Sequence, residues 1–232
     1  MEASASPASV TPQQPTIIWK PYIENVPLDH LSQGRALLEY GYFNEAIAEL
    51  SIAATTGPDL VEANNLLGQA YDRTGAHRHA QEYYERALSV APYNSSVLHN
   101  LGYSLYLADD YNAAMKHLRQ AAHAAPNDAR IAGSIALVQI RLRKYNDAFK
   151  SLARLDGEYG ARVKLAEMLR AANQQEEAIK QYEAALRLQP GSPVILEHLA
   201  ELYQRTGRTK EAEAARRTLA KPQPNKPLTG GG

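Results

Sequence analysis

The sequence predicts an all-α fold, a solenoid of about six stacked helix-turn-helix units. Three observations lead to this prediction. A set of residues recurs at steps of 34 positions, apolar residues within each step recur every three to four positions, and glycine and proline fall at fixed places between the apolar stretches. One helix pair is too small to bury its own apolar stripe, so neighbouring pairs must stack and bury it together.

The repeat is clearest in the second and third units, which align residue by residue. The second unit contains Leu67, Gly68, Tyr71, Gly75, Ala80, Tyr84, Ala87 and Pro92. The third unit contains, in the same places, Leu101, Gly102, Leu105, Asp109, Ala114, Leu118, Ala121 and Pro126. When the alignment is extended in both directions, units begin near residues 27, 61, 95, 129, 159 and 193.

The recurring residues have structural reasons. Gly41, Gly75 and Gly207 fall in the turn within a unit, where a left-handed residue is favoured. A proline follows the second helix of four units, at positions 58, 92, 126 and 190, because proline cannot continue a helix. Small residues stand where the two helices of a unit must approach closely, and these are Gly34, Gly68, Gly102, Ala136, Ala166 and Ala200.

The spacing changes once along the chain. The step from the fourth unit to the fifth is 30 residues rather than 34, and the expected proline is missing near Asp156, Gly157 and Gly160. We expect a shortened turn here, and either a tolerated deletion or a bend that serves a binding groove would leave this pattern. The last helix, Thr209 to about Ala220, is polar, as the end of a repeat stack requires.

The chain divides into four parts. Residues 1–15, rich in Ala, Ser, Pro and Gln, predict a disordered tether. Residues 16–26 predict an extended apolar segment around Trp19, which either plugs the first unit or docks in a groove of its own or a neighbouring chain and so mediates self-association. Residues 27–220 predict the solenoid, and residues 221–232 predict a flexible tail.

These motifs and their spacing resemble the tetratricopeptide-repeat (TPR) family over roughly residues 27–220. The resemblance implies a right-handed superhelix whose first helices line a concave groove, where an extended peptide or a helix of another protein binds. Asn and Gln can bond a peptide backbone, Tyr gives rigid contact area, and Arg can fork onto a carboxylate. The family's groove positions map onto Asn65, Gln69, Asp72, His99, Asn100, Tyr103, Tyr106, Arg130, Ser134, Leu137 and Arg141.

One TPR subgroup binds the C-terminal carboxylates of chaperones through a clamp of Lys, Asn, Asn, Lys and Arg. Asn100 matches the second Asn of that clamp, and Arg130 stands in for the second Lys. Asn65, Gln69 and Ser134 replace the first Lys, the first Asn and the Arg. These departures disfavour a co-chaperone role for the chain.

The sequence carries no sign of catalytic chemistry. It has no cysteine, no GxxxxGK[ST] or GxGxxG loop, and its seven histidines are scattered. We therefore expect no enzyme activity, no cofactor and no metal. The 25 basic and 25 acidic residues balance, which gives no support for a nucleic-acid partner but leaves room for a local charged patch.

The compartment stays open between the bacterial periplasm or envelope and the cytoplasm. No run approaches the ~20 apolar residues that span a bilayer, and the first residues lack the basic start and apolar stretch of a signal peptide. The tether, the NLGYSLYLADDYNAAMKHLRQAA unit and the shortened fourth repeat resemble bacterial TPR proteins of pilus, secretion or envelope assembly, including tight-adherence pilus lipoproteins. The alternative function is a regulatory or substrate-binding subunit of an enzyme complex.

Overall fold

A computed structural model describes residues 29–55 and 59–220, and this part of the chain is built of helices without strands. The predicted tether (1–15), apolar segment (16–26) and tail (221–232), together with Pro58, lie outside these residues. The helices are α1 (His30–Glu39), α2 (Phe43–Ala53), α3 (Leu60–Arg73), α4 (His77–Val90), α5 (Ser95–Leu107), α6 (Tyr111–Ala124), α7 (Ala129–Arg141), α8 (Tyr145–Ala171), α9 (Gln175–Leu188), α10 (Pro193–Arg205) and α11 (Thr209–Leu219).

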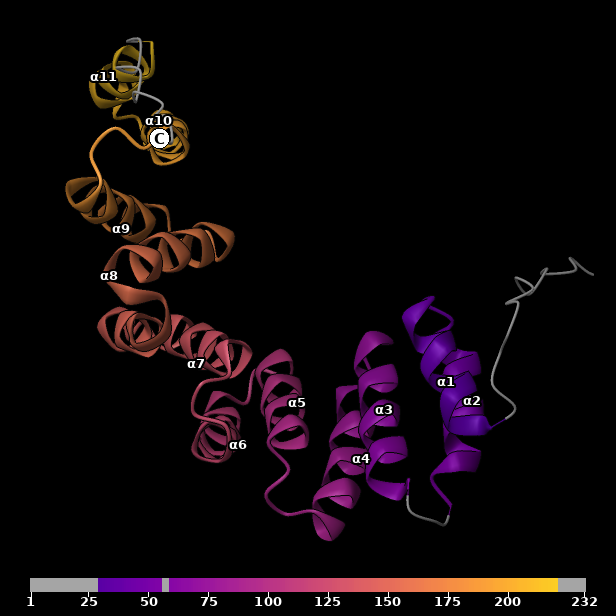
Figure 1. The fold of residues 1–232 in the computed structure, drawn as a ribbon. Coiled ribbons are helices and arrows are strands. Elements are labelled where there is room, and N and C mark those ends of the chain that lie inside the picture. The colour runs from indigo at the N-terminus through magenta and orange to yellow at the C-terminus, as the bar shows by residue number, and fades with distance from the viewer. Residues whose placement is uncertain (1–28, 56–58, 221–232) are drawn as a thin grey trace, which may run out of the picture.

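The helices follow one another along an open arc, and each packs against the next in the chain (Figure 1). The first helices of successive units also touch, because α1 contacts α3, α3 contacts α5 and α5 contacts α7. In the arc, α3 and α7 lie nearer the inside than α4 and α6 (Figure 1). The predicted all-α solenoid of helix pairs is therefore confirmed for the described residues.

Side-chain caps begin four of these helices. Asp29, Asn94, Asp110 and Asp128 each stand directly before a helix, and the side-chain oxygen of each accepts a hydrogen bond from a backbone N–H of the first turn. Such caps satisfy N–H groups that have no partner within the helix. The residue directly before each of α1, α5, α6 and α7 therefore helps to fix where that helix begins.

Close helix packing depends on the small residues that the repeat predicts. A methyl group placed on Gly102 would come within 2.7 Å of Leu118 Cγ, far inside normal contact distance. The same addition on Gly68 would overlap the Tyr84 ring. In each case the large partner stands sixteen residues after the glycine and is fully buried. The prediction that small residues permit close approach is thus confirmed at these positions.

The turns within units use a left-handed residue, as predicted for Gly41, Gly75 and Gly207, whose φ angles are 84°, 81° and 77°. Three other units place a residue with a side chain in the same conformation, and these residues are Asp109, Arg143 and Asn173. Asp and Asn adopt positive φ more readily than most residues, whereas Arg does not. Nothing in the composition of the turn after α7 signals this conformation.

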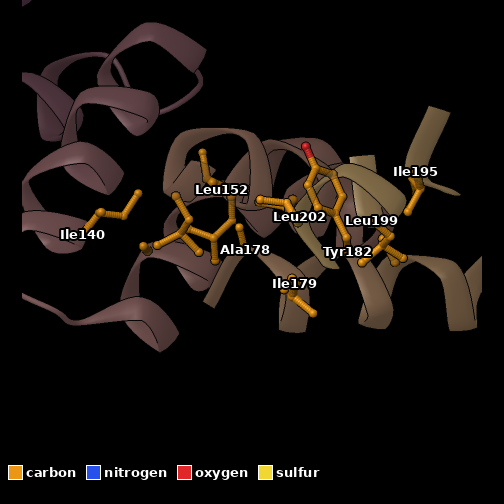
Figure 2. Packing of buried hydrophobic residues seen from close by; sticks show 14 of the residues in the cluster. Ile140, Leu152, Ala178, Ile179, Tyr182, Ile195, Leu199 and Leu202 are labelled. Atoms are coloured by element: carbon orange, nitrogen blue, oxygen red, sulfur yellow. The ribbon is translucent and has the colours of Figure 1, made fainter. Parts of the chain in front are cut away.

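The largest buried cluster runs through the C-terminal helices α7 to α11 (Figure 2). Figure 2 shows Leu202 and Leu199 on either side of Tyr182, and Leu152 and Ala178 further toward Ile140 in the same cluster. The N-terminal helices hold several smaller clusters instead, each shared by adjacent units. Stacking of neighbours, rather than a single central core, therefore buries the apolar surface.

The shortened step between units four and five leaves no loop. α8 combines the second helix of unit four with the first helix of unit five, and Gly157 is the residue inside it with non-helical angles, φ 66° and ψ 178°. This backbone conformation is nearly restricted to glycine. The expected shortened turn is thus reduced to one kinked residue.

We predict that Gly157→Ala destabilises the protein by about 1–3 kcal/mol, because alanine does not tolerate this conformation. A methyl group at Gly157 would meet no atom within 4 Å, so the loss would come from the backbone and not from a clash. The midpoint of urea unfolding measures the change. Gly133→Ala is the matched control, since Gly133 lies inside α7 and also has free space; it should stabilise the protein by about 0.5–1 kcal/mol.

Candidate functional site

Two adjoining cavities lie on the side of the solenoid formed by the first helices. One, of about 420 Å³, is lined by α1, the start of α2 and α3, and the other, of about 410 Å³, is lined mainly by α3 and α5. Gln69 and Arg73 of α3 line both cavities. The two cavities therefore form one continuous hollow over α3, which we call the inner groove.

The inner groove presents mixed chemistry. Tyr103 and Leu107 on α5 line one side and stay 38% and 39% exposed. Tyr40, 65% exposed, lines the other end. Arg73 lies exposed between them and forms no ion pair with any described residue. The groove thus offers aromatic and aliphatic contacts around an available cation.

Asp72 fixes the helices that form the wall of the groove. Its carboxylate accepts hydrogen bonds from Tyr84 Oη at 3.0 Å and Ser104 Oγ at 2.7 Å, and it lies 2.8 Å from His77 Nδ1. These partners come from α4 and α5, whereas Asp72 belongs to α3. Burial, with the nearby Asp72 charge, raises the pKa of Tyr84, so the phenol stays protonated and donates. One carboxylate therefore holds three helices in register.

A chain of polar side chains links three successive units. Asn100 Nδ2 donates to Asn65 Oδ1 at 2.9 Å, and His99 Nε2 lies 2.9 Å from Ser134 Oγ. His99 Nδ1 lies 3.3 Å from Asn100 Oδ1, which closes the link between the two bonds. These residues belong to α3, α5 and α7, so the bonds run along the first helices. We call this set the polar ladder.

Aromatic rings continue from the ladder along α5. His99 stacks with Tyr103 at 6.5 Å between ring centroids, and Tyr103 stacks with Tyr106 at 5.8 Å. Tyr106 packs at 6.0 Å against Tyr111, whose ring lies under the Arg141 guanidinium. The rings support one another, so Tyr103 is held in place at the edge of the groove.

The structure divides the sequence-predicted residues into groups. Gln69, Asp72, Asn100 and Tyr103 line the inner groove. Asn65, His99 and Ser134 join Asn100 in the polar ladder, and Tyr106 belongs to the aromatic row.

The unit-four residues lie away from the groove. Arg130 forks onto Asp128 of its own helix start, with Nη2–Oδ2 at 2.7 Å. Arg141 bonds Tyr111 Oη at 2.8 Å and pairs with Asp109 at 3.2 Å. Leu137 is half-buried on α7. Both arginines, which the sequence suggested for binding a ligand carboxylate, are therefore already paired with aspartates of the chain.

The candidate residues named from the sequence do not include Tyr40, Arg73 or Leu107. Tyr40 directly follows α1, and Leu107 is the last residue of α5, 34 residues after Arg73 and therefore at the same place in its unit. Other large apolar side chains, such as Tyr93, are also exposed, so the cavity lining rather than exposure alone places Tyr40 and Leu107 in the groove. The structure thus moves the centre of the candidate site from units two to four toward units one to three.

Over residues 29–55 and 59–220, His, Asp and Glu side chains gather in no group of three suited to hold a metal ion. In the same residues, none of the helices combines the length and apolar character needed to span a bilayer.

Comparisons with known proteins decide the family. Models described as "Tetratricopeptide repeat" and "TPR repeat" match residues 31–96 and 166–207, and one described as "Anaphase-promoting complex, cyclosome, subunit 3" matches residues 73–155. The chain is a tetratricopeptide-repeat protein. The expected resemblance is confirmed, with the two TPR models matching the first two units and the stretch from the fifth unit to the turn before the last helix.

Two curated relatives of this TPR chain are BBSome complex members BBS4. The protein of Xenopus tropicalis is 29% identical over 133 residues, which cover 56% of this chain and 26% of the relative. The protein of Bos taurus is 24% identical over 192 residues, which cover 81% of this chain and 37% of the relative. The TPR chain therefore spans well under half the length of these relatives.

Solved TPR structures share the fold at low identity. A tetratricopeptide repeat protein from Parabacteroides merdae aligns with a TM-score of 0.60 and 18% identity, over 84% of this chain and 79% of its own. PilF of Pseudomonas aeruginosa aligns with a TM-score of 0.58 and 21% identity, over 82% and 88%. The Cut9–Hcn1 hetero-tetramer of the APC/C aligns at 0.57 and 15%, over 82% and 38%.

We predict that Asp72→Asn destabilises the TPR chain by about 1–3 kcal/mol, because an amide has one acceptor oxygen where the carboxylate serves several donors. Urea unfolding measures the loss. Asp109→Asn is the control, since Asp109 forms its ion pair at a surface where its side chain is 71% exposed; it should cost under about 1 kcal/mol. Equal losses in the two variants would contradict the role of Asp72.

His99 makes stability depend on pH. Burial lowers the pKa of His99, so the folded state disfavours the imidazolium. An unfolded histidine titrates near about 6.5, and the unfolded chain therefore binds more protons as the pH falls below that value. The His99 contribution to stability is therefore constant above about pH 6.5, decreases as the pH falls from there toward the lowered folded pKa, and levels off below it.

We predict that His99→Gln reduces the loss of stability between neutral and mildly acidic pH, measured by urea unfolding at each pH. Burial also lowers the pKa of His117, so part of the dependence should persist in this variant. An unchanged slope would show that His99 is not responsible.

Proposed function

We propose that this TPR chain is a scaffold or adaptor that binds an extended segment or a helix of another protein in the inner groove, and that it does not itself catalyse a reaction. The observation that carries the proposal is the continuous groove over α3, with Tyr103 and Leu107 exposed along its rim. Clusters of exposed apolar and aromatic side chains in a hollow are typical of binding sites.

The groove chemistry supports peptide capture. Gln69 is the amide at the centre of the groove, where it can bond a peptide backbone. Arg73 can pair with a carboxylate of the partner, because none of the described carboxylates is paired with it. Asn100 and Asp72 are committed to the ladder and to the α4–α5 contacts, so they shape the wall. The rigid wall limits the entropy lost on binding.

The biological setting stays a proposal. A role in pilus, secretion or envelope assembly rests on the resemblance of the tether, the third unit and the shortened fourth repeat to bacterial TPR proteins. The likeness to PilF supports the fold but not this role. A regulatory or substrate-binding subunit of an enzyme complex would use the same groove. A chaperone-binding role lacks support, because Arg130 is paired with Asp128 and Ser134 is bonded to His99.

The test replaces exposed groove side chains that hold no structural bond. We predict that Tyr103→Ala/Leu107→Ala lowers partner binding at least about tenfold, as loss of two apolar anchors does at interfaces. An aromatic photo-crosslinking residue in place of Tyr40, which lines the groove and leaves Arg73 intact, captures the partner from native cells, and titration of the purified partner measures the affinity.

Leu188→Ser/Val194→Ser is the matched control, because these side chains are 45% and 57% exposed and lie outside the groove. The control should bind as the parent chain does. Equal affinity of the groove variant and the parent, with unchanged helical circular dichroism, would place the partner elsewhere.

A further inference from the structure

The balanced total charge conceals a strong separation along the chain. Residues 29–110 contain four Lys or Arg against eleven Asp or Glu, a formal charge of −7. Residues 111–154 contain eight Lys or Arg against two Asp, a formal charge of +6. The positive segment corresponds to α6, α7 and the first part of α8. The local patch that the net charge leaves room for is therefore present on three consecutive helices.

Part of this charge lines a second groove. A cavity of about 390 Å³ and another of about 340 Å³ lie between α6 and the first half of α8, over α7, and Arg119 lines both. Lys116 and Lys144 line the first cavity, and Arg154 lines the second. We call this hollow the outer basic groove, since α6 lies on the outside of the arc (Figure 1). It does not overlap the inner groove.

The cations of the outer basic groove are available to a partner. Lys116, Arg119 and Lys144 are exposed, and none of them pairs with a carboxylate of the described residues. Arg154 donates to the Pro126 carbonyl oxygen, which leaves its charge uncompensated. By contrast, Arg130 and Arg141 in the same segment are both neutralised by aspartates. The positive charge of the groove is therefore not neutralised by ion pairs within the described part of the chain, unlike that of the neighbouring Arg130 and Arg141.

The carboxylates of the outer basic groove are fewer than its cations. Asp128 lines the second cavity but is occupied by Arg130. Asp147 lines the first cavity. The groove also has an apolar floor, to which Met115 and Leu142 contribute in one cavity and Ile135 in the other. Its chemistry is therefore cationic along the rims and apolar beneath.

We propose that the outer basic groove binds a short acidic segment of a partner protein, with carboxylates on the two rims and apolar side chains on the floor. The lining residues extend over about 16 Å of α6 at 1.5 Å per residue, which accommodates about five residues of extended chain at 3.3 Å each. A nucleic acid fits less well, because its backbone is charged throughout and offers no aliphatic side chain to the apolar floor of the groove.

The probe for this site is a synthetic octapeptide with blocked ends, a fluorescein label, four glutamates and two leucines. Fluorescence anisotropy with the whole chain should show binding that weakens as salt rises, since the ion pairs form at a solvated rim. Lys116→Gln/Arg119→Gln should weaken binding about tenfold. Both side chains are exposed, and circular dichroism verifies that the variant remains folded.

Arg187→Gln/Lys210→Gln is the matched control, because it removes the same charge from exposed positions that lie outside the groove. This variant, and the inner-groove variant Tyr103→Ala/Leu107→Ala, should bind the peptide within about twofold of the parent chain. That pattern separates the outer site from the proposed inner one, so either proposal can fail alone.

Four outcomes would overturn the proposal. The first is equal weakening by the two charge-removing variants, which would indicate unspecific attraction. The second is loss of the peptide in the inner-groove variant. The third is tighter binding of a single-stranded oligonucleotide of equal charge. The fourth is self-association of the chain at low salt, seen by sedimentation and abolished by Lys116→Gln/Arg119→Gln, which would assign the groove to a second copy.

Discussion

The structure depends on one recurring contact, in which a small residue on the first helix of a unit faces a large residue on the second. Gly68 against Tyr84 and Gly102 against Leu118 show how little space remains between the two helices. This contact sets the distance within a pair, and the apolar stripe that is left over is buried by the next pair. The distance between the two helices of a unit therefore also determines where the residues that line both grooves lie.

The polar groups of the first helices serve mainly to hold this arrangement. Asp72 joins α3, α4 and α5, and the polar ladder continues the connection into α7. A buried polar group costs free energy unless it is bonded, so these residues are stabilising only as a set. The rim residues Tyr103 and Arg73 are then free to meet another molecule on a wall that does not need to rearrange.

The periodicity of the sequence is sufficient for the fold, because glycine, proline and apolar spacing report packing directly. The candidate site is less predictable. A position taken from the family's repeat indicates which face of the helix a side chain occupies, but not whether that side chain already has a hydrogen-bond or ion-pair partner within the chain. Arg130 illustrates this, because its partner Asp128 is also the cap of α7. Arg143 illustrates the same limit for backbone, as its left-handed turn has no local signal. The inner groove itself arises from the stacking of three units.

The kink at Gly157 has a consequence for how the array comes apart. Helical backbone continues on both sides of it, and the same buried cluster extends from α7 to α11. In a nearest-neighbour description of a repeat array, the coupling between units four and five therefore exceeds that between the N-terminal units, whose clusters are small and separate. The units are therefore unequally coupled, and the N-terminal units can unfold locally while α7 to α11 stay folded.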